Sequence, residues 1–447
     1  MANTTLILFG FGVLMLLLTL GVPVVVSLGL TSVLGVGLLT GSSDVAISIL
    51  SSTAFEALRD YVFAVIPLFI LMGEFVARSG AALDLYNSIN RLMRRVPGRL
   101  AVATVLGNAV FGAIVGVSVA SAAAFSRIAY PAMCKAGYDK SVSLGCIAGS
   151  ASLGMLIPPS ILMIVWGVLT QQSISKLFLA GVLPGIALAL MFALFCIVYA
   201  IIKPEAFGRK PELAGADAGT ASRDADLPPL SKSELIGTGG CLVMIALVLG
   251  GIWSGMFTPT EGAGIGALLA LVLALIKGVR WEGFVEVIRE TGKAAAPIMC
   301  LLIFAQMYSR LLALSGVGGT VQTFVTGLNM DPGMVLLAMV LVWFVLGMFI
   351  DSVSIILLTV PIFVPLANSF GIDPYAFALI GILSIEAGII TPPFGLVVFT
   401  VKGCVNDPAV TLGQIFWGAS PYWMMLLVLA LIVYFVPPLA TLLPAIL

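Results

Sequence analysis

Histidine is absent from this chain of 447 residues, and no two cysteines form a CxxC pair. The missing histidine removes the commonest metal ligand and the commonest general base. The six cysteines are Cys134, Cys146, Cys196, Cys241, Cys300 and Cys404. Because most of them lie in apolar runs, we expect small buried residues rather than disulfides or metal ligands.

Motifs for hydrolytic catalysis are also missing. The sequence has no HExxH, and no GxSxG that would open a strand–helix turn. Only Ser–Lys chemistry would remain. Lys140 and Lys176 lie in predicted loops without a clear serine partner. We therefore expect the protein not to be an enzyme.

Charged residues are scarce: they make up 9% of the chain, against 60% hydrophobic residues, and the mean hydropathy is +1.18. A soluble domain carries about 25% charged residues, so the sequence predicts an all-α integral membrane protein. At ~20 residues per span, the length allows about ten to fourteen spanning or hairpin segments. The net charge is zero, which gives no indication of nucleic acid binding. No basic region precedes the first apolar run, so we expect no cleavable signal peptide.

Two adjacent prolines interrupt long apolar runs at two places, within Gly154–Ser160 and within Gly388–Gly395. Proline lacks a backbone N–H and clashes with the preceding turn, so each helix must break there. Within a membrane such a break is tolerated only where protein, water or a ligand covers it. Paired breaks at matched places in two halves of a chain indicate the central site of a transporter. A simple kink covered by neighbouring helices is the alternative for either copy alone.

The first half, residues 1–202, begins with apolar segments over 6–20 and 22–39 and a span over 61–78. Residues 81–99 have helical spacing of apolar side chains, which predicts an amphipathic arm helix at the membrane surface; a polar loop is the alternative. Residues 100–133 contain a small, polar break at Gly116–Ser121. Basic residues flank both ends of this stretch, so both ends should face the cytoplasm, which favours a re-entrant hairpin over a single crossing. A broken helix over 141–170 and a span over 177–202 follow.

Residues 203–232 are the only long hydrophilic stretch, and we expect a cytoplasmic linker there. The second half, 233–447, starts with spans over 234–253 and 261–276. A surface segment over 280–293 then leads to a span that opens at Pro297. An amphipathic stretch over 317–330, a hairpin over 334–368, a broken helix over 375–402 and a final span over 416–436 complete the predicted order.

Four landmarks recur at offsets of 230 to 236 residues, which indicates an internal duplication. Pro259 follows Pro23 by 236 residues, and Gly347 follows Gly112 by 235. The second hairpin is flanked by acidic residues without nearby Lys or Arg, so its ends should face away from the cytoplasm. The sequence therefore predicts two inverted-topology repeats, with both termini outside.

Hairpin tips and broken helices that meet near the bilayer midplane would present oxygen ligands suited to a small hard cation such as sodium. We expect one sodium ion per hairpin–break pair. The candidate sodium ligands are Ser118, Ser121, Gly154, Pro158, Asp351, Ser352, Ser354, Gly388, Thr391 and Pro392. The candidate substrate contacts are Gly116, Ser150, Ser152, Ser160, Ser384, Glu386 and Phe394. Half-helix N-termini would attract a carboxylate.

Each candidate has a structural alternative. Small residues near Gly116 would also allow close helix packing. Asp351 and Glu386 are the sharpest candidates, because an intramembrane carboxylate is costly and usually functional; the alternative is a charge paired with a basic side chain or facing water. Glu261 more plainly anchors a helix start after Thr258-Pro259. Arg127 and Arg310 are expected to pair with acidic residues or to steer substrate, and their expected positions favour pairing.

The sequence resembles a known family at these motifs, in the right order and over essentially the whole chain. The matching segments are Phe111–Ala120, Ala136–Lys140, Gly154–Ser160, Phe257–Glu261, Gly347–Asp351 and Ile390–Gly395. They resemble the large membrane subunit of TRAP transporters, the DctM or SiaM type. The family often has Val where Phe394 stands, and the larger Phe394 would narrow the substrate cavity. The first hairpin tip of the family is usually richer in Ser than the Val115-Gly116-Val117 of this chain.

The resemblance implies sodium-coupled uptake of an organic acid, such as a C4-dicarboxylate or a sialic acid, across a bacterial inner membrane. It implies an elevator motion of the hairpins and broken helices. It also implies two partners, a small four-helix membrane subunit (DctQ type) and a periplasmic binding protein (DctP or SiaP type). Because the first apolar run starts at once, we expect the small subunit to be a separate chain. The alternative is an inverted-repeat sodium–anion symporter that works alone.

Overall fold

The computed structural model describes residues 12–208, 231–328 and 330–446. Throughout these ranges the chain is helical and contains no strand, apart from an isolated bridge between Tyr138 and Phe207. Eight of the described helices are long and apolar enough to cross a membrane. The predicted fold class, an all-α membrane protein, is therefore confirmed. The start of the predicted segment 6–20 and most of the predicted linker 203–232 lie outside the described residues.

The first half contains a helical segment over residues 12–19 and ten further α-helices. They are α2 (Val24–Thr40), α3 (Ser43–Arg59), α4 (Val65–Ser79), α5 (Ala81–Leu92), α6 (Arg99–Val115), α7 (Ser118–Lys135), α8 (Lys140–Ala151), α9 (Leu153–Leu156), α10 (Ile161–Thr170) and α11 (Ile174–Ile202). Two short 3-10 helices, η1 (Tyr61–Ala64) and η2 (Pro204–Ala206), precede α4 and follow α11.

The second half repeats this order of helices. It contains α13 (Lys232–Trp253), α14 (Pro259–Ile276), α15 (Trp281–Ser315), α16 (Val317–Gly327), α17 (Pro332–Gly347), α18 (Ser352–Ser369), α19 (Pro374–Gly388), α20 (Leu396–Cys404), α21 (Leu412–Phe435) and α22 (Pro438–Ile446). Helices α17, α18 and α19 begin 233, 234 and 234 residues after α6, α7 and α8. The opposite orientation of the two halves in the membrane stays a prediction from the charge pattern.

One boundary predicted in the second half is wrong. The surface segment 280–293 and the span from Pro297 are a single helix, α15, which continues through Pro297. Proline in a helix removes one hydrogen bond but need not end the helix where neighbours hold both sides. The first turns of α15 are held on α4, where Arg78 pairs with Glu286 at 2.5 Å and the rings of Phe75 and Phe284 pack with centroids 5.8 Å apart.

The arm helix is shorter than predicted but is a helix rather than a polar loop. Helix α5 ends at Leu92, and residues 93–98 form turns that include Pro97 and Gly98, with φ of +67° at Gly98. Its polar face packs on α13 and on the end of α14. Asp84 pairs with Lys277 at 2.5 Å, and Ser88 lies 2.8 Å from Thr238. These contacts fix α5 to the second half of the chain.

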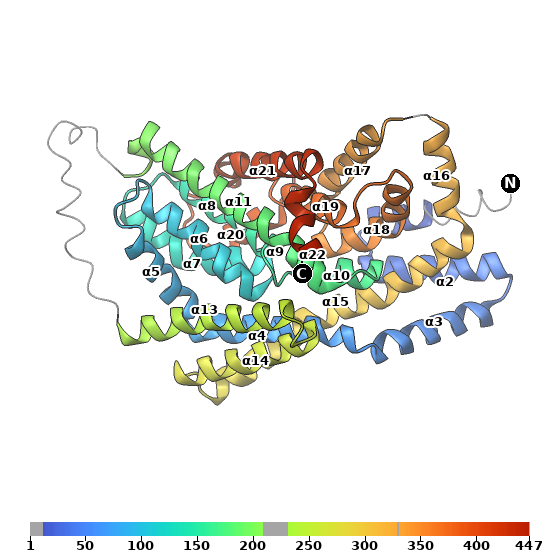
Figure 1. Ribbon diagram of the computed structural model, residues 1–447, viewed down its shortest axis with the longest axis horizontal. Coiled ribbons are helices and arrows are strands. Elements are labelled where there is room, and N and C mark those ends of the chain that lie inside the picture. The colour runs from blue at the N-terminus through green and yellow to red at the C-terminus, as the bar shows by residue number, and fades with distance from the viewer. Residues whose placement is uncertain (1–11, 209–230, 329, 447) are drawn as a thin grey trace.

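The helices form two packed groups that lie side by side (Figure 1). One group contains α4, α13 and α14 together with α2, α3 and α15. The other contains the paired helices α6–α7 and α17–α18 and the broken helices α8–α10 and α19–α20. In this second group each broken helix crosses to the other half, because α10 packs on α18 and α20 packs on α7. The chain thereby brings both breaks into one body.

Candidate functional site

The two Pro-Pro sequences break their helices at matched places. Helix α9 ends at Leu156 and α10 starts at Ile161, whereas α19 ends at Gly388 and α20 starts at Leu396. The peptide bond between the two prolines is cis in both breaks. Because proline cannot donate a backbone hydrogen bond, the segments between the half-helices leave main-chain groups available to other partners.

A glycine pair places each hairpin beside its break. A methyl group on Gly112 would come within 2.4 Å of the Gly154 Cα atom, and one on Gly347 within 2.8 Å of the Gly388 Cα atom. No larger residue fits such contacts between backbones. Gly154 and Gly388, two of the predicted sodium ligands, therefore lie against the hairpins of their own halves.

The first hairpin tip contacts the first break directly. Helix α6 ends at Val115, and the following Gly116, with φ of +67°, turns the chain toward α7. The carbonyl oxygen of Gly116 accepts a hydrogen bond of 3.2 Å from the backbone N–H of Ile161, the first residue of α10. The tip of one element therefore satisfies an open N–H group of the other.

The second hairpin tip carries an acidic cap. Asp351 precedes α18, and its carboxylate accepts hydrogen bonds from the backbone N–H of Ser354 at 3.0 Å and from the Ser354 hydroxyl at 2.5 Å. An aspartate at this position satisfies open N–H groups and favours the positive end of the helix. Asp351 therefore has a capping role in addition to any contact with an ion.

Glu386 is the point where the two hairpins meet. Its side chain is 1% exposed, and its Oε1 atom accepts a hydrogen bond of 2.9 Å from the hydroxyl of Ser352 at the second tip. The hydroxyl of Ser118, at the first tip, faces the same carboxyl without completing a hydrogen bond. The Oε2 atom has no hydrogen-bond partner in the described part of the chain. Both tips and the second broken helix thus converge on one buried carboxyl.

The first tip offers oxygen atoms that suit a cation. Ser118 and Ser121 are buried, and their hydroxyls have no hydrogen-bond partner among the described residues. The Ser121 hydroxyl and the Val117 carbonyl lie next to Gly154, since a methyl group there would come within 3.3 and 3.7 Å of them. Hard cations such as sodium prefer hydroxyl and carbonyl oxygens of this kind. The predicted ligands Ser121 and Gly154 therefore lie together, and Ser118 lies one helical turn before Ser121 on α7.

The other predicted hydroxyl residues donate to backbone carbonyls a few residues earlier in the chain. The acceptors lie three to five residues earlier for Ser150, Ser152, Ser160, Ser384 and Thr391. Each oxygen keeps lone pairs for a second partner, so these bonds are compatible with ion or substrate contact. They also show that each hydroxyl has a local structural partner.

Asn108 was not among the sequence candidates. It is buried in α6, and its Nδ2 atom donates to the Ser150 hydroxyl at 2.7 Å, whereas its Oδ1 atom has no partner within the described ranges. A lone amide within an apolar run is the signal that points to such a residue, since a polar group in a membrane helix is costly.

The two breaks differ in exposure. In the first, Pro158, Pro159 and Ser160 are buried. Pro159 shares an apolar lining with Met72 of α4 and Met244 of α13. In the second, Pro392, Pro393 and Phe394 are exposed. The first break is therefore covered by the neighbouring helix group, and the second is open.

The remaining charged candidates have structural roles or surface positions. Glu261 forms a capping box with Thr258 at the start of α14, as predicted. Arg310 pairs with Glu56 of α3, which confirms the expected pairing. Arg127 is exposed. No group of three His, Cys, Asp or Glu residues that could hold a metal ion occurs in the described ranges, and all six cysteines are free.

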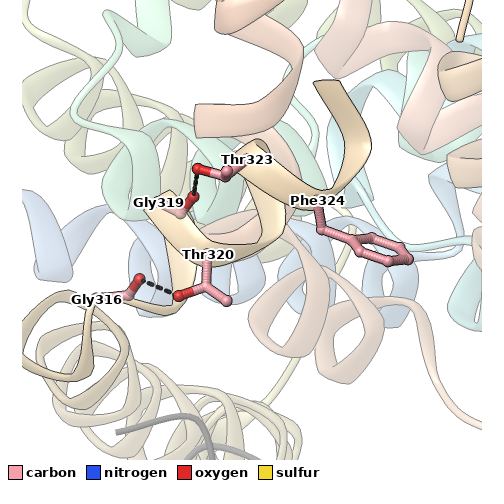
Figure 2. A pocket seen from close by; sticks show the side chains of 5 residues that line it. All are labelled: Gly316, Gly319, Thr320, Thr323 and Phe324. Carbon is pink, nitrogen blue, oxygen red and sulfur yellow. Dashed lines mark hydrogen bonds between the residues drawn. The ribbon is translucent and has the colours of Figure 1, made fainter. Parts of the chain in front are cut away.

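A surface hollow on α16 lies outside this convergence (Figure 2). It is lined by Gly316, Gly319, Thr320, Thr323 and Phe324. Both threonine hydroxyls are engaged, because Thr320 donates to the Gly316 carbonyl and Thr323 to the Gly319 carbonyl. The hollow therefore offers no cluster of available polar side chains, and the candidate site remains at the tips and breaks.

Solved structures of similar fold are membrane transporters. The YdaH transporter of Alcanivorax borkumensis matches 90% of this chain and 88% of its own with a TM-score of 0.60 at 16% identity. The antimetabolite efflux pump MtrF of Neisseria gonorrhoeae matches 88% of this chain and 84% of its own with a TM-score of 0.58 at 16% identity. At this identity the likeness shows the fold alone.

Sequence relatives share much more of the chain. The C4-dicarboxylate TRAP transporter large permease protein DctM of Pseudomonas aeruginosa is 34% identical over 420 residues, which cover 94% of this chain and 93% of the relative. The ectoine TRAP transporter large permease protein TeaC of Halomonas elongata is 29% identical and covers 95% of each chain. The sialic acid TRAP transporter large permease protein SiaM of Vibrio cholerae is 28% identical and covers 96% of each.

The family model "Tripartite ATP-independent periplasmic transporter, DctM component" matches residues 11–439. This match confirms the resemblance noted from the motifs, and the relatives are transport proteins rather than enzymes. The chain belongs to the DctM family of TRAP transporter large permease subunits and is a multi-pass protein of the bacterial inner membrane.

Proposed function

We propose that this chain is the transport subunit of a sodium-coupled secondary transporter that imports an organic acid. The observation that carries the proposal is the convergence at Glu386. The Ser352 hydroxyl binds its Oε1 atom, and the Ser118 hydroxyl faces the same group from the other hairpin. A site built from two tips and a broken helix changes when either hairpin or the break moves. Ion and substrate occupancy would therefore be linked through shared parts.

Sodium is the coupling ion that fits these donors. The hydroxyls of Ser118 and Ser121, with the carbonyls beside Gly154 and Pro158, would hold one ion in the first half. Asp351, Ser352, Ser354 and Thr391, with the carbonyls of Gly388 and Pro392, would hold one in the second. Bound sodium would supply positive charge close to a substrate carboxylate. The residues present are hard oxygen donors without a sulfur or imidazole among them, which favours an alkali cation over a transition metal.

The substrate would lie between the tips and the second break. Helix α20 starts at Leu396, and Gly395 before it provides no side-chain cap, whereas Ser160 caps α10. An uncapped helix start presents N–H groups and a positive dipole end to an anion. Gly116, Ser150, Ser152, Ser384, Glu386 and Phe394 remain the further candidate contacts. The relatives named for C4-dicarboxylate, ectoine and sialic acid support an organic acid as the transported class.

Two partners complete the proposed transporter: a small four-helix membrane subunit of the DctQ type and a periplasmic binding protein that delivers the solute. The tripartite family name supports this assembly. We further propose an elevator motion, in which the hairpins and broken helices move as one body against α2–α4 and α13–α15. The packing of α10 on α18 and α20 on α7 supports a single moving body.

Reconstitution tests the proposal. Proteoliposomes that contain the chain and its small membrane subunit receive loaded binding protein outside, with an inward gradient of either sodium or potassium. We expect accumulation of the acid with sodium only, and only with binding protein. Equal accumulation with potassium would refute sodium coupling, and full accumulation without binding protein would favour a symporter that works alone.

A further inference from the structure

Two exposed phenylalanines lie together at the open break. Phe349 lies between α17 and α18 at the second hairpin tip, and Phe394 follows the second Pro-Pro sequence. Their ring centroids are 5.9 Å apart with planes inclined by 58°. The two residues are 55% and 57% exposed. The pair therefore joins the second tip to the second break and leaves much of both rings uncovered.

The surroundings of the pair indicate water rather than lipid. The rings belong to irregular segments, 348–351 and 391–395, in which Pro392 and Pro393 are also exposed. Irregular backbone inside a bilayer does not face lipid and occurs only where protein covers it or where it lines a wet cavity. No described residue covers these segments fully, which favours a wet cavity beside the rings.

The aromatic pair is present in one half only. At the offset of 235 between Gly112 and Gly347, Phe349 corresponds to Ile114, and at the offset of 234 between the breaks, Phe394 corresponds to Ser160. Ile114 and Ser160 are both buried. The Ser160 hydroxyl donates to the Met155 carbonyl at 2.5 Å. The repeated fold therefore does not require an aromatic residue at either position.

We propose that Phe349 and Phe394 form an apolar subsite that selects organic acids with an apolar or aromatic carbon body. The inference rests on the proposed function, since it assigns the substrate class of that same site. The start of α20, at Leu396, lies two residues after Phe394 in the sequence. An acid held there places its carboxylate at this helix start and its carbon body on the rings. A polyhydroxylated acid would lose water from its hydroxyls against rings that accept no hydrogen bond, which disfavours it.

Thermal unfolding of the purified complex with its small membrane subunit, in sodium buffer, tests the subsite with two probes. Hexanoate and gluconate are both six-carbon monocarboxylates, one apolar and one polyhydroxylated. We expect wild type to be stabilised by hexanoate at a concentration about tenfold lower than by gluconate. Two single variants, Phe394→Val and Phe349→Leu, keep an apolar side chain, and each should raise the hexanoate concentration needed for stabilisation. The double Ala variant should raise it by about tenfold. In all of these variants the gluconate concentration needed for stabilisation should stay within about twofold of the wild-type value.

Phe324→Ala is the matched control, because Phe324 is also an exposed ring, 68% exposed, but lies in the hollow on α16 (Figure 2). It should leave both probes unaffected. The proposal is overturned if gluconate stabilises wild type at the same concentration as hexanoate, or if neither probe stabilises it. It is also overturned if the Phe349 and Phe394 variants leave the hexanoate concentration unchanged, or if Phe324→Ala changes it as much as they do. Selective binding of hexanoate without sodium-driven uptake would overturn the proposed function alone. Sodium-driven uptake of an organic acid, without a preference for hexanoate over gluconate in binding, would overturn the subsite alone.

Discussion

Gly112 of the first hairpin lies against Gly154 of the first broken helix, so closely that a methyl group on Gly112 would come within 2.4 Å of the Gly154 Cα atom. The second half repeats this contact between Gly347 and Gly388, at 2.8 Å. Two backbones that approach this closely hold the tip at a fixed height beside the break. The contact thus links the hairpins to the site that they form.

Replacing Gly112 by Ala should separate the hairpin from the break. Overpacking of a close contact costs about 1–3 kcal/mol, so we expect a lower unfolding temperature and reduced uptake. Gly264→Ala is the matched control, since Gly264 is a helical glycine of α14 with nothing within 4 Å of the added methyl group. The control should be neutral or slightly stabilising. A Gly112→Ala variant with the stability and uptake of wild type would refute the role of the contact.

Asp351→Asn separates charge from capping. Asparagine caps a helix about as well as aspartate, so the unfolding temperature should change little. If Asp351 is a sodium ligand, the loss of its charge should reduce sodium-driven uptake by about tenfold or more. Asp331→Asn is the control, because Asp331 caps α17 through the Gly333 N–H at 2.8 Å and is exposed. Full sodium-dependent uptake by Asp351→Asn would leave Asp351 with a capping role only.

The Asp84–Lys277 pair should anchor the arm helix α5. Its side chains are 11% and 9% exposed, and the Nζ–Oδ2 distance is 2.5 Å. Removal of one partner leaves a nearly buried charge, at a cost of about 3–5 kcal/mol. Asp84→Asn and Lys277→Met should therefore each lower the unfolding temperature strongly, and the double variant should lower it less than the two losses added. Strictly additive losses would show that the pair is not coupled.

Much of this architecture follows from local chemistry. Two adjacent prolines break a helix wherever they occur, so Pro158 and Pro392 located the breaks without knowledge of the fold. Thr258 and Glu261 likewise form the predicted capping box, since its partners are three residues apart. Such features depend on neighbours along the chain, which the sequence displays directly.

Other features depend on residues distant in sequence. A lone Pro297 suggested the start of a helix, but α15 continues through it. Phe284 packs on Phe75 before the proline, and Arg310 pairs with Glu56 after it. Tertiary packing also sets the contact of Asn108 with Ser150. It likewise determines that the first break is buried and the second is exposed. No local pattern in the sequence distinguishes an exposed Pro-Pro break from a covered one.

Asp407 gives a pH prediction. It lies in the loop between α20 and α21, where Lys140 Nζ at 2.6 Å, the Tyr130 hydroxyl at 2.9 Å and the Ala409 N–H at 2.9 Å lower its pKa from 3.8 to about 2. A lowered pKa in the folded state contributes stability above the unfolded value and loses it as pH falls through the folded value. Wild type should therefore unfold at a higher temperature than Asp407→Asn at pH 6.

The difference in unfolding temperature should shrink as pH falls below about 4, because wild-type Asp407 then loses the benefit of its charge. Thermal unfolding of both proteins over the pH range checks this. Lys140→Gln should reduce the same difference already at neutral pH. A difference that stays constant down to the lowest pH would show that Asp407 acts through its shape rather than its charge.

The most direct test of the inverted hairpins is labelling of single cysteines from each side of the membrane. In a background with Cys134, Cys300 and Cys404 replaced by serine, Arg94→Cys and Lys135→Cys flank the first hairpin, and Leu328→Cys and Asn368→Cys flank the second. An impermeant thiol reagent should label the first two only from the cytoplasmic face and the last two only from the periplasmic face. Labelling of Arg94→Cys and Lys135→Cys from opposite faces would show that residues 100–133 cross the membrane completely, and would contradict a site formed by two hairpins that enter from opposite sides.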